Sequence, residues 1–261
     1  MEVRRRLSNG LYFQANYTFS KNLTNAVGTS QALFDPYLDI NNKDLDKQRA
    51  DFDQTHVFNF NGIYQLPFGR GAKFFNWGGF ADKVLGGWQI SGLAQWTSGA
   101  PITFIDTRGT YNRGGRSGRQ TANSSLTNAE IRGLMGIFEQ NGNIYWINPA
   151  ILNANGQASA GYGSTPFSGQ VFFNVNPGET GALGRTIVNG PVYFNANAAV
   201  LKNIRFGEKM RVQLRAEAFN LLNNVNFFNN TQFANINSSS FGQVTSAGAP
   251  REIQFAARFE F

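Results

Sequence analysis

Hydrophobic and polar side chains alternate along several stretches of this chain with a period of two residues. Between Leu11 and Ser20 every second residue is apolar, and most of the residues between them are polar. The alternation returns in residues 56–66, 88–97, 210–218 and 252–261, and in weaker form in 193–206 and 2–7. Successive side chains of a strand point to opposite faces of its sheet, so the pattern predicts roughly seven strands with one apolar and one polar face. Val57, Ile63 and Leu93 break the pattern by placing apolar side chains on the polar face.

The predicted strands are joined by connections of unequal length. Two connections are short and contain glycine, Ser8-Asn9-Gly10 and Gly207-Glu208-Lys209, as in tight β-hairpins. Three are long and polar, residues 21–54, 99–191 and 223–250, and the connection 67–87 is intermediate. An antiparallel order places both short turns at one rim and all long loops at the other. This arrangement is typical of outer-membrane β-barrels, which have short periplasmic turns and long extracellular loops.

Trp88 and Trp96 are eight residues apart on the apolar face of one predicted strand. At about 3.3 Å per residue, they are separated by roughly 26 Å along the strand. A tilt of about 40° projects this distance to about 20 Å, close to the roughly 25 Å apolar band whose borders carry aromatic side chains. We therefore expect both tryptophans to be interfacial aromatic anchors.

Composition restricts the class of protein further. Charged residues make up 15% of the 261 residues, against about 25% in an average soluble domain, so uncharged polar side chains must cover much of the surface. The net charge of +7 is compatible with anionic partners, but the positive charges are scattered. The absence of cysteine excludes disulfides, thiolate zinc sites and a cysteine nucleophile. No stretch approaches the roughly 18 to 20 apolar residues of a membrane helix, and residues 1–7 lack the apolar run of a secretory signal.

Alternation by itself also fits a soluble β-sandwich, in which the apolar faces of two sheets share one core. The low charge content, the unequal connections and the terminal aromatic residue favour an all-β antiparallel transmembrane β-barrel instead. The barrel is also favoured by charged residues that share the polar parity of two neighbouring strands: Arg211, Arg215, Glu217, Arg258 and Glu260. Two alternatives stay open: a small complete outer-membrane barrel of about eight strands with a structural or adhesive role, and a soluble sandwich that binds carbohydrate.

Several segments of the chain are similar to the C-terminal part of TonB-dependent outer-membrane transporters, specifically to the Oar-like family often fused to a carboxypeptidase-regulatory-like domain. The similarity covers nearly the whole chain, and the order and spacing of its segments carry it. These segments are 9–11 through 17–21, 51–53 with 56–58, 64–71 (Tyr-Gln-Leu-Pro-Phe-Gly-Arg-Gly), 86–92 (Gly-Gly-Trp-Gln-Ile-Ser-Gly), 98–102, 215–223 (Arg-Ala-Glu-Ala-Phe-Asn-Leu-Leu-Asn) and 250–255.

The resemblance implies a barrel of about 22 strands that is closed by a separate plug domain. Residues 1–261 then form a partial receptor barrel in the cell outer membrane of a Gram-negative type, without the plug and the N-terminal strands. The implied function is uptake of a bulky nutrient or other cargo, which the loops capture. The implied partners are outer-membrane lipid, lipopolysaccharide, the barrel-assembly machinery and, through the missing plug, the TonB complex. We expect no nucleic-acid partner.

The chain ends in Phe261, on the same parity as Ile253, Phe255 and Phe259. In the family that the chain resembles, such a terminal strand is the signal read by the barrel-assembly machinery. Strand addition explains this role physically, because an exposed edge offers unpaired backbone groups and alternate side chains set the register. We therefore expect Phe255, Phe259 and Phe261 to form the assembly signal. The alternative is that Phe261 is simply the last lipid-facing residue.

Residues with catalytic or metal-binding chemistry are sparse, and we expect neither an enzyme nor a cofactor or metal. His56 is the only histidine and has no Ser and Asp partners at triad spacing, so a structural or interfacial role is favoured. The acidic loop 35–53 offers oxygen ligands for calcium but departs from the EF-hand order, which favours a solvated loop. The cluster Arg113-Gly114-Gly115-Arg116-Ser117-Gly118-Arg119 is isolated and lacks interleaved aromatics, which favours solvent or lipopolysaccharide phosphate over nucleic acid.

The polar parity supplies the remaining candidates for ligand contact. Uncharged amides with a few charged groups suit a water-filled barrel interior that hydrogen-bonds passing cargo. The same residues would equally solvate the wall or bond to a plug. The candidates for lumen-facing contact are Asn59, Gln89, Arg211, Arg215 and Glu217, together with Gln14, Asn16, Asn61, Gln95 and Gln213.

Overall fold

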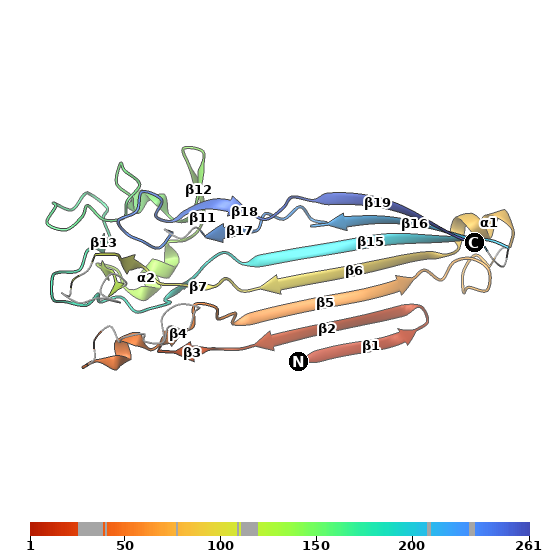
Figure 1. The fold of residues 1–261 in the computed structure, drawn as a ribbon, viewed down its shortest axis with the longest axis horizontal. Helices are drawn as coiled ribbons and strands as arrows, with labels where there is room; N and C mark the ends of the chain where they lie inside the picture. Colours follow the sequence, from red (N-terminus) through yellow and green to blue (C-terminus); the bar gives the residue numbers. More distant parts are fainter. Residues whose placement is uncertain are drawn as a thin grey trace.

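Seven long antiparallel strands form one sheet, in which each strand pairs with the long strands before and after it along the chain (Figure 1). The computed structural model describes residues 1–25, 39, 41–76, 78–108, 110, 120–207, 210–229 and 233–261. The seven strands are β1 (Glu2–Ser8), β2 (Leu11–Phe19), β5 (His56–Gln65), β6 (Trp88–Thr97), β15 (Tyr193–Phe206), β16 (Met210–Phe219) and β19 (Glu252–Glu260). They confirm the seven strands that the alternation predicts.

The predicted difference between the two rims of the sheet is confirmed. The turn between β1 and β2 has φ of 51° at Asn9 and 77° at Gly10, and Ser8 pairs with Leu11 across it. Positive φ at both central residues defines the type I′ hairpin turn, for which Asn-Gly is the preferred sequence. In the second predicted turn, Glu208 and Lys209 lie outside the described residues, while the pairing of Phe206 with Met210 closes the hairpin around them.

The long loops meet at the opposite rim and fold into a packed cap (Figure 1). Its core contains Phe104, Phe172 and Phe241, whose rings are fully buried with centroids 4.9 to 5.6 Å apart. The sequence pattern predicted only polar connections here. The short elements of these loops are β3 (Leu23–Thr24), the 3-10 helix Lys43–Asp46, β4 (Gln48–Arg49), β7 (Pro101–Ile102), β8 (Ile105–Asp106), β9 (Gln120–Thr121), β10 (Asn123–Ser124), α2 (Asn128–Gly133), β11 (Met135–Gln140), β12 (Asn143–Ile147), the 3-10 helix Pro149–Ile151, β13 (Phe172–Phe173), β14 (Val188–Asn189), β17 (Phe227–Asn229) and β18 (Gln243–Ala247).

The sheet is a single layer, and its apolar face is uncovered. Phe255 is 79% exposed and Phe259 is 60% exposed, although both belong to the apolar parity of β19. No second sheet packs on this face in the part of the chain that the structure describes. The soluble sandwich is therefore wrong, because its apolar faces must be buried against each other. A single layer with an exposed apolar face and a polar opposite face is the wall of a β-barrel.

The intermediate connection between β5 and β6 contains a short helix at the tight-turn rim, α1 (Phe80–Leu85), near the C-terminus of the chain (Figure 1). No helix in the described ranges is long and apolar enough to cross a membrane.

Candidate functional site on the polar face

Strand register places the predicted polar residues together on one face. Asn59 pairs with Asn16 on one side and with Gln95 on the other, and Gln95 pairs with Asn195. Directly paired residues in antiparallel strands have side chains on the same face, so these four amides form a row across four strands. Within it, the amide Nδ2 of Asn59 donates a hydrogen bond to Oδ1 of Asn16 at 3.1 Å.

Ion pairs are concentrated at the C-terminal side of this face. Arg211 Nε donates to Glu260 Oε2 at 2.8 Å, and Arg258 Nε lies 3.1 Å from the other carboxylate oxygen of Glu260. Arg215 Nη2 donates to Glu217 Oε1 at 2.5 Å along the same strand. These side chains are partly exposed, and exposed pairs contribute little stability, about 0–1 kcal/mol each. They place three guanidinium groups beside carboxylates on the polar face.

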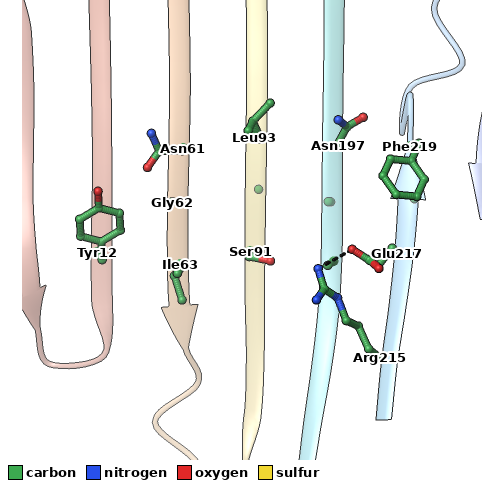
Figure 2. A pocket seen from close by; sticks show the side chains of 14 residues that line it. Tyr12, Asn61, Gly62, Ile63, Ser91, Leu93, Asn197, Arg215, Glu217 and Phe219 are labelled. Carbon is green, nitrogen blue, oxygen red and sulfur yellow. Dashed lines mark hydrogen bonds and ion pairs between the residues drawn. The ribbon is translucent and has the colours of Figure 1, made fainter. Parts of the chain in front are cut away.

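A hollow of about 340 Å³ lies in the middle of the polar face and spans β2, β5, β6, β15 and β16 (Figure 2). Its lining includes four apolar or aromatic side chains on a face that is mostly polar: Tyr12, Ile63, Leu93 and Phe219. Leu93 is 51% exposed and Phe219 is 41% exposed, so both present apolar surface to the space in front of the wall. Arg215 and Glu217 lie at one side of the hollow, and the amide of Asn61 lies near its other side (Figure 2).

Sequence reasoning predicted this site only in part. Of the five residues singled out for contact, Arg215 and Glu217 line the hollow, whereas Asn59, Gln89 and Arg211 do not. Leu201 pairs with both Gln89 and Arg215, so Gln89 and Arg215 lie in one row on the polar face. Period-two alternation places Tyr12 on the polar face, leaves Ile63 and Leu93 as exceptions and ends before Phe219. The signal that would have found the hollow is the set of exceptions itself, because the register brings them together.

Amides without partners give the face its hydrogen-bonding capacity. In the described part of the chain, the side chains of Asn61, Gln89 and Gln95 make no hydrogen bond, and Oδ1 of Asn195 is buried without a partner. Each free amide offers two donors and one acceptor oxygen. The amides of Asn61, Gln89 and Gln95 and the exposed apolar side chains of the hollow form a surface that can bind a ligand with both polar groups and apolar surface.

The remaining predicted site residues lie on the apolar face. Trp88 and Trp96 occupy opposite ends of β6, with Trp96 between Phe58 and Phe194 and Trp88 beside Lys202. Of the expected assembly residues, Phe255 and Phe259 lie in the edge strand β19, and Phe261 comes directly after it. The ring centroids of Phe259 and Phe261 lie 6.3 Å apart. Phe261 is 95% exposed.

His56 lies at the loop rim of β5 among aromatic rings. Its Nδ1 is 2.7 Å from the hydroxyl of Tyr17, and its ring centroid lies 5.3 Å from that of Phe19 and 6.4 Å from that of Trp96. The structural or interfacial role of His56 stays a prediction.

The acidic loop is less solvated than its sequence indicated. Asp46 is buried and lies 3.6 Å from Arg185, and buried Asp53 accepts a hydrogen bond from the backbone of Asn22 at 2.7 Å. For these two aspartates the solvated interpretation is wrong, because Asp46 contacts Arg185 of the second long loop and Asp53 binds the backbone just before β3. Asp35 and the cluster 113–119 lie outside the described residues. Within the described ranges, no group of three or more His, Cys, Asp or Glu side chains could hold a metal ion.

Comparison with known proteins agrees with this architecture. A family model described as "outer membrane beta barrel domain" matches residues 1–254. No curated protein and no solved structure matches the chain. The matched region contains six of the seven long strands and the first residues of β19, together with the cap. The chain belongs to the outer membrane beta barrel domain family.

Proposed function

We propose that this chain forms part of the barrel wall of a TonB-dependent, Oar-like transporter, which takes up a bulky nutrient or other cargo through the outer membrane of a Gram-negative cell. The observation that carries the proposal is the polar face, where free amides and an apolar hollow of about 340 Å³ lie on a wall whose other face is apolar. A water-filled interior needs polar lining, and a transient binding surface needs groups that the wall itself does not satisfy. The proposal assigns no catalytic step, cofactor or metal to the chain.

The cap is proposed to capture the cargo outside the cell. The described residues of the two later long loops share one hydrophobic core, which includes Phe104, Phe172 and Phe241. The first long loop is tied to them by the guanidinium of Arg49, which donates to Asn189 Oδ1 at 2.6 Å. A packed cap presents its surface side chains in fixed positions, which lowers the entropic cost of binding a ligand. Lipopolysaccharide is the neighbour that this rim would meet.

Two edges of the sheet are proposed to pair with further strands. In the described chain, β1 has a partner strand only in β2, and β19 has one only in β16. Unpaired backbone groups are costly in a membrane, where no water can satisfy them. Additional strands would close a larger barrel, and a plug inside it would contact the TonB complex.

The aromatic side chains of β19 are proposed to guide assembly. Phe255, Phe259 and Phe261 share one face of an edge strand, so a protein of the barrel-assembly machinery can add a strand to the free edge and read these side chains together.

An immunoblot with an antibody against residues 233–250 tests the proposed size and location. In fractionated membranes, we expect an outer-membrane band that shifts on heating and is several times larger than the 28.8 kDa of this chain. A heat-modifiable band near 28.8 kDa would favour the small complete barrel instead.

Capture of the detergent-extracted protein by the purified periplasmic domain of TonB tests the energised step, and failure to bind would contradict TonB dependence.

A further inference from the structure

The connection between β5 and β6 folds against the apolar face of the sheet at the tight-turn rim. Lys202 extends from β15 on this face, and its Nζ donates hydrogen bonds to the carbonyl oxygens of Val84, at 2.9 Å, and of Gly86. The indole Nε1 of Trp88 donates to the same Val84 oxygen at 2.9 Å. Two wall side chains therefore hold the C-terminal end of α1 in a fixed position over the sheet.

A groove of about 690 Å³ runs along the wall next to this helix. Its walls are almost entirely apolar and come from β15, β16, β19 and α1, with Trp88 from β6. Strand register orders the lining from the rim toward the middle of the sheet: Ile204 lies nearest the rim, Lys202 and Leu214 follow, and Val200 and Phe255 lie deepest. The groove is thus parallel to the direction in which a lipid chain would lie beside a barrel wall.

The rim end of the groove carries positive charge. The Nζ of Lys83 lies over the ring of Phe206, 4.9 Å from its centroid, and no carboxylate of the described residues forms an ion pair with it. The nearby Asp82 is engaged locally, because its Oδ1 accepts the backbone N–H of Arg70 at 2.6 Å. An ammonium group over an aromatic ring at the end of an apolar groove is the arrangement in which a basic side chain reaches toward lipid headgroups.

We propose that this groove binds an anionic phospholipid, with its phosphate at Lys83 and an acyl chain along Val200, Leu214 and Phe255. This inference rests on the proposed function, in which the apolar face meets lipid and the tight-turn rim lies in the periplasm. Charge complementarity selects the occupant, because a zwitterionic lipid would fill the groove equally well but would gain less at the ammonium group. One interfacial lysine corresponds to about a fivefold preference for anionic lipid.

Quenching of tryptophan fluorescence by lipids with brominated chains measures this preference. In the full chain, Trp77, Trp96 and Trp146 are replaced by phenylalanine, so that Trp88 is its only tryptophan. This variant is inserted into mixed vesicles of phosphatidylglycerol and phosphatidylcholine. Brominated phosphatidylglycerol should quench Trp88 with an apparent affinity about fivefold higher than brominated phosphatidylcholine. Lys83→Gln should abolish the preference. Lys73→Gln is the matched control, since it removes the same charge at the same rim from a residue that does not line the groove.

Three outcomes would overturn the proposal. A second variant, which retains only Trp96, distinguishes these outcomes from failure of the proposed function. Equal quenching of Trp88 by both lipids would mean ordinary boundary lipid. Retention of the preference in Lys83→Gln would mean that Lys83 does not bind the lipid phosphate. Quenching of Trp96 but not of Trp88 would mean that another protein surface covers the groove. If neither tryptophan is quenched, the apolar face does not meet lipid, and the proposed wall function itself fails.

Discussion

Phe255 and Gln254 are neighbours in β19 but face opposite sides of the sheet. Phe255 pairs with Ala216 on the exposed apolar face, whereas Gln254 pairs with Glu217 on the polar face. Phe255→Arg should therefore cost up to about 2–4 kcal/mol near the membrane midplane. Gln254→Arg should be tolerated, because the new guanidinium lies opposite a carboxylate. Urea unfolding of the two variants in vesicles measures the difference, and equal stability of both would contradict the assignment of the faces.

Glu130 provides a pH-dependent contact in the cap. Its carboxylate accepts hydrogen bonds from the backbone N–H and the hydroxyl of Thr127, both at 2.8 Å, in a capping box that starts α2. The backbone hydrogen bond, followed by the hydroxyl, holds the pKa of Glu130 below its usual value. A lowered folded-state pKa stabilises the helix above the usual carboxyl pKa, and this contribution is lost as the pH falls through the folded value.

The expected result is that amide protection of buried Ile131 decreases on acidification below the usual carboxyl pKa. In Glu130→Gln, this decrease should be absent over the same pH range. Hydrogen exchange followed in both proteins measures it, with Thr127→Ser as the control that keeps the cap. An identical pH dependence in wild type and Glu130→Gln would show that another group is responsible.

For single residues, the sequence predicts well which face of the sheet a side chain occupies, but it predicts poorly which residues of other strands lie beside it. Period-two alternation assigns Asn59, Arg215 and Phe255 to their faces, since parity is a local property of a strand. The hollow needs register between β2, β5, β6, β15 and β16, which one strand does not encode. Phe219 illustrates this limit. It shares the parity of Arg215 and Glu217 and therefore lies on the polar face, but only the register between strands brings it into the hollow with Leu93.

Among the elements, the cap depends on a core that is separate from the sheet. Phe104 is fully buried and contacts Phe172 and Phe241, so Phe104→Ala should destabilise the cap by about 3–5 kcal/mol. The sheet should persist, because its hydrogen bonds do not involve this core. Limited proteolysis of intact cells should then cleave the loops of Phe104→Ala, while the protein keeps its heat-modifiable mobility. Ile137→Ala, at a cap position that is 60% exposed, is the control and should resist cleavage.

The long strands and tight turns were predictable because their signals are local, whereas the cap was not. Its core residues are scattered singly through polar sequence, and loop residues more than a hundred positions apart pack together, as Phe104 and Phe241 do. The cap does contain one local signal of this kind. Asn141-Gly142 has φ of 52° and 75° and joins β11 to β12 in the same type of hairpin as Asn9-Gly10.

For the whole molecule, the open edges of the sheet distinguish the larger barrel from the small complete one. A small barrel must pair β1 with β19, whereas a larger barrel inserts further strands between them. The chain contains no cysteine, so introduced cysteine pairs report contacts without background. Disulfides need Cα atoms about 4.4–6.8 Å apart, which only directly adjacent strands provide.

We therefore expect no intramolecular disulfide in the membrane-inserted protein when Val3→Cys in β1 is combined in turn with cysteine at each apolar-face position of β19. The positive control is the register pair Ala216→Cys with Phe255→Cys, which should cross-link under the same oxidation. Testing every apolar position of β19 is necessary, because barrel closure staggers the two edges by an unknown shear. A disulfide between β1 and β19 at any register, in a monomeric band on a non-reducing gel, would establish closure by these seven strands alone. It would remove the space for a plug, and with it the proposed dependence on TonB.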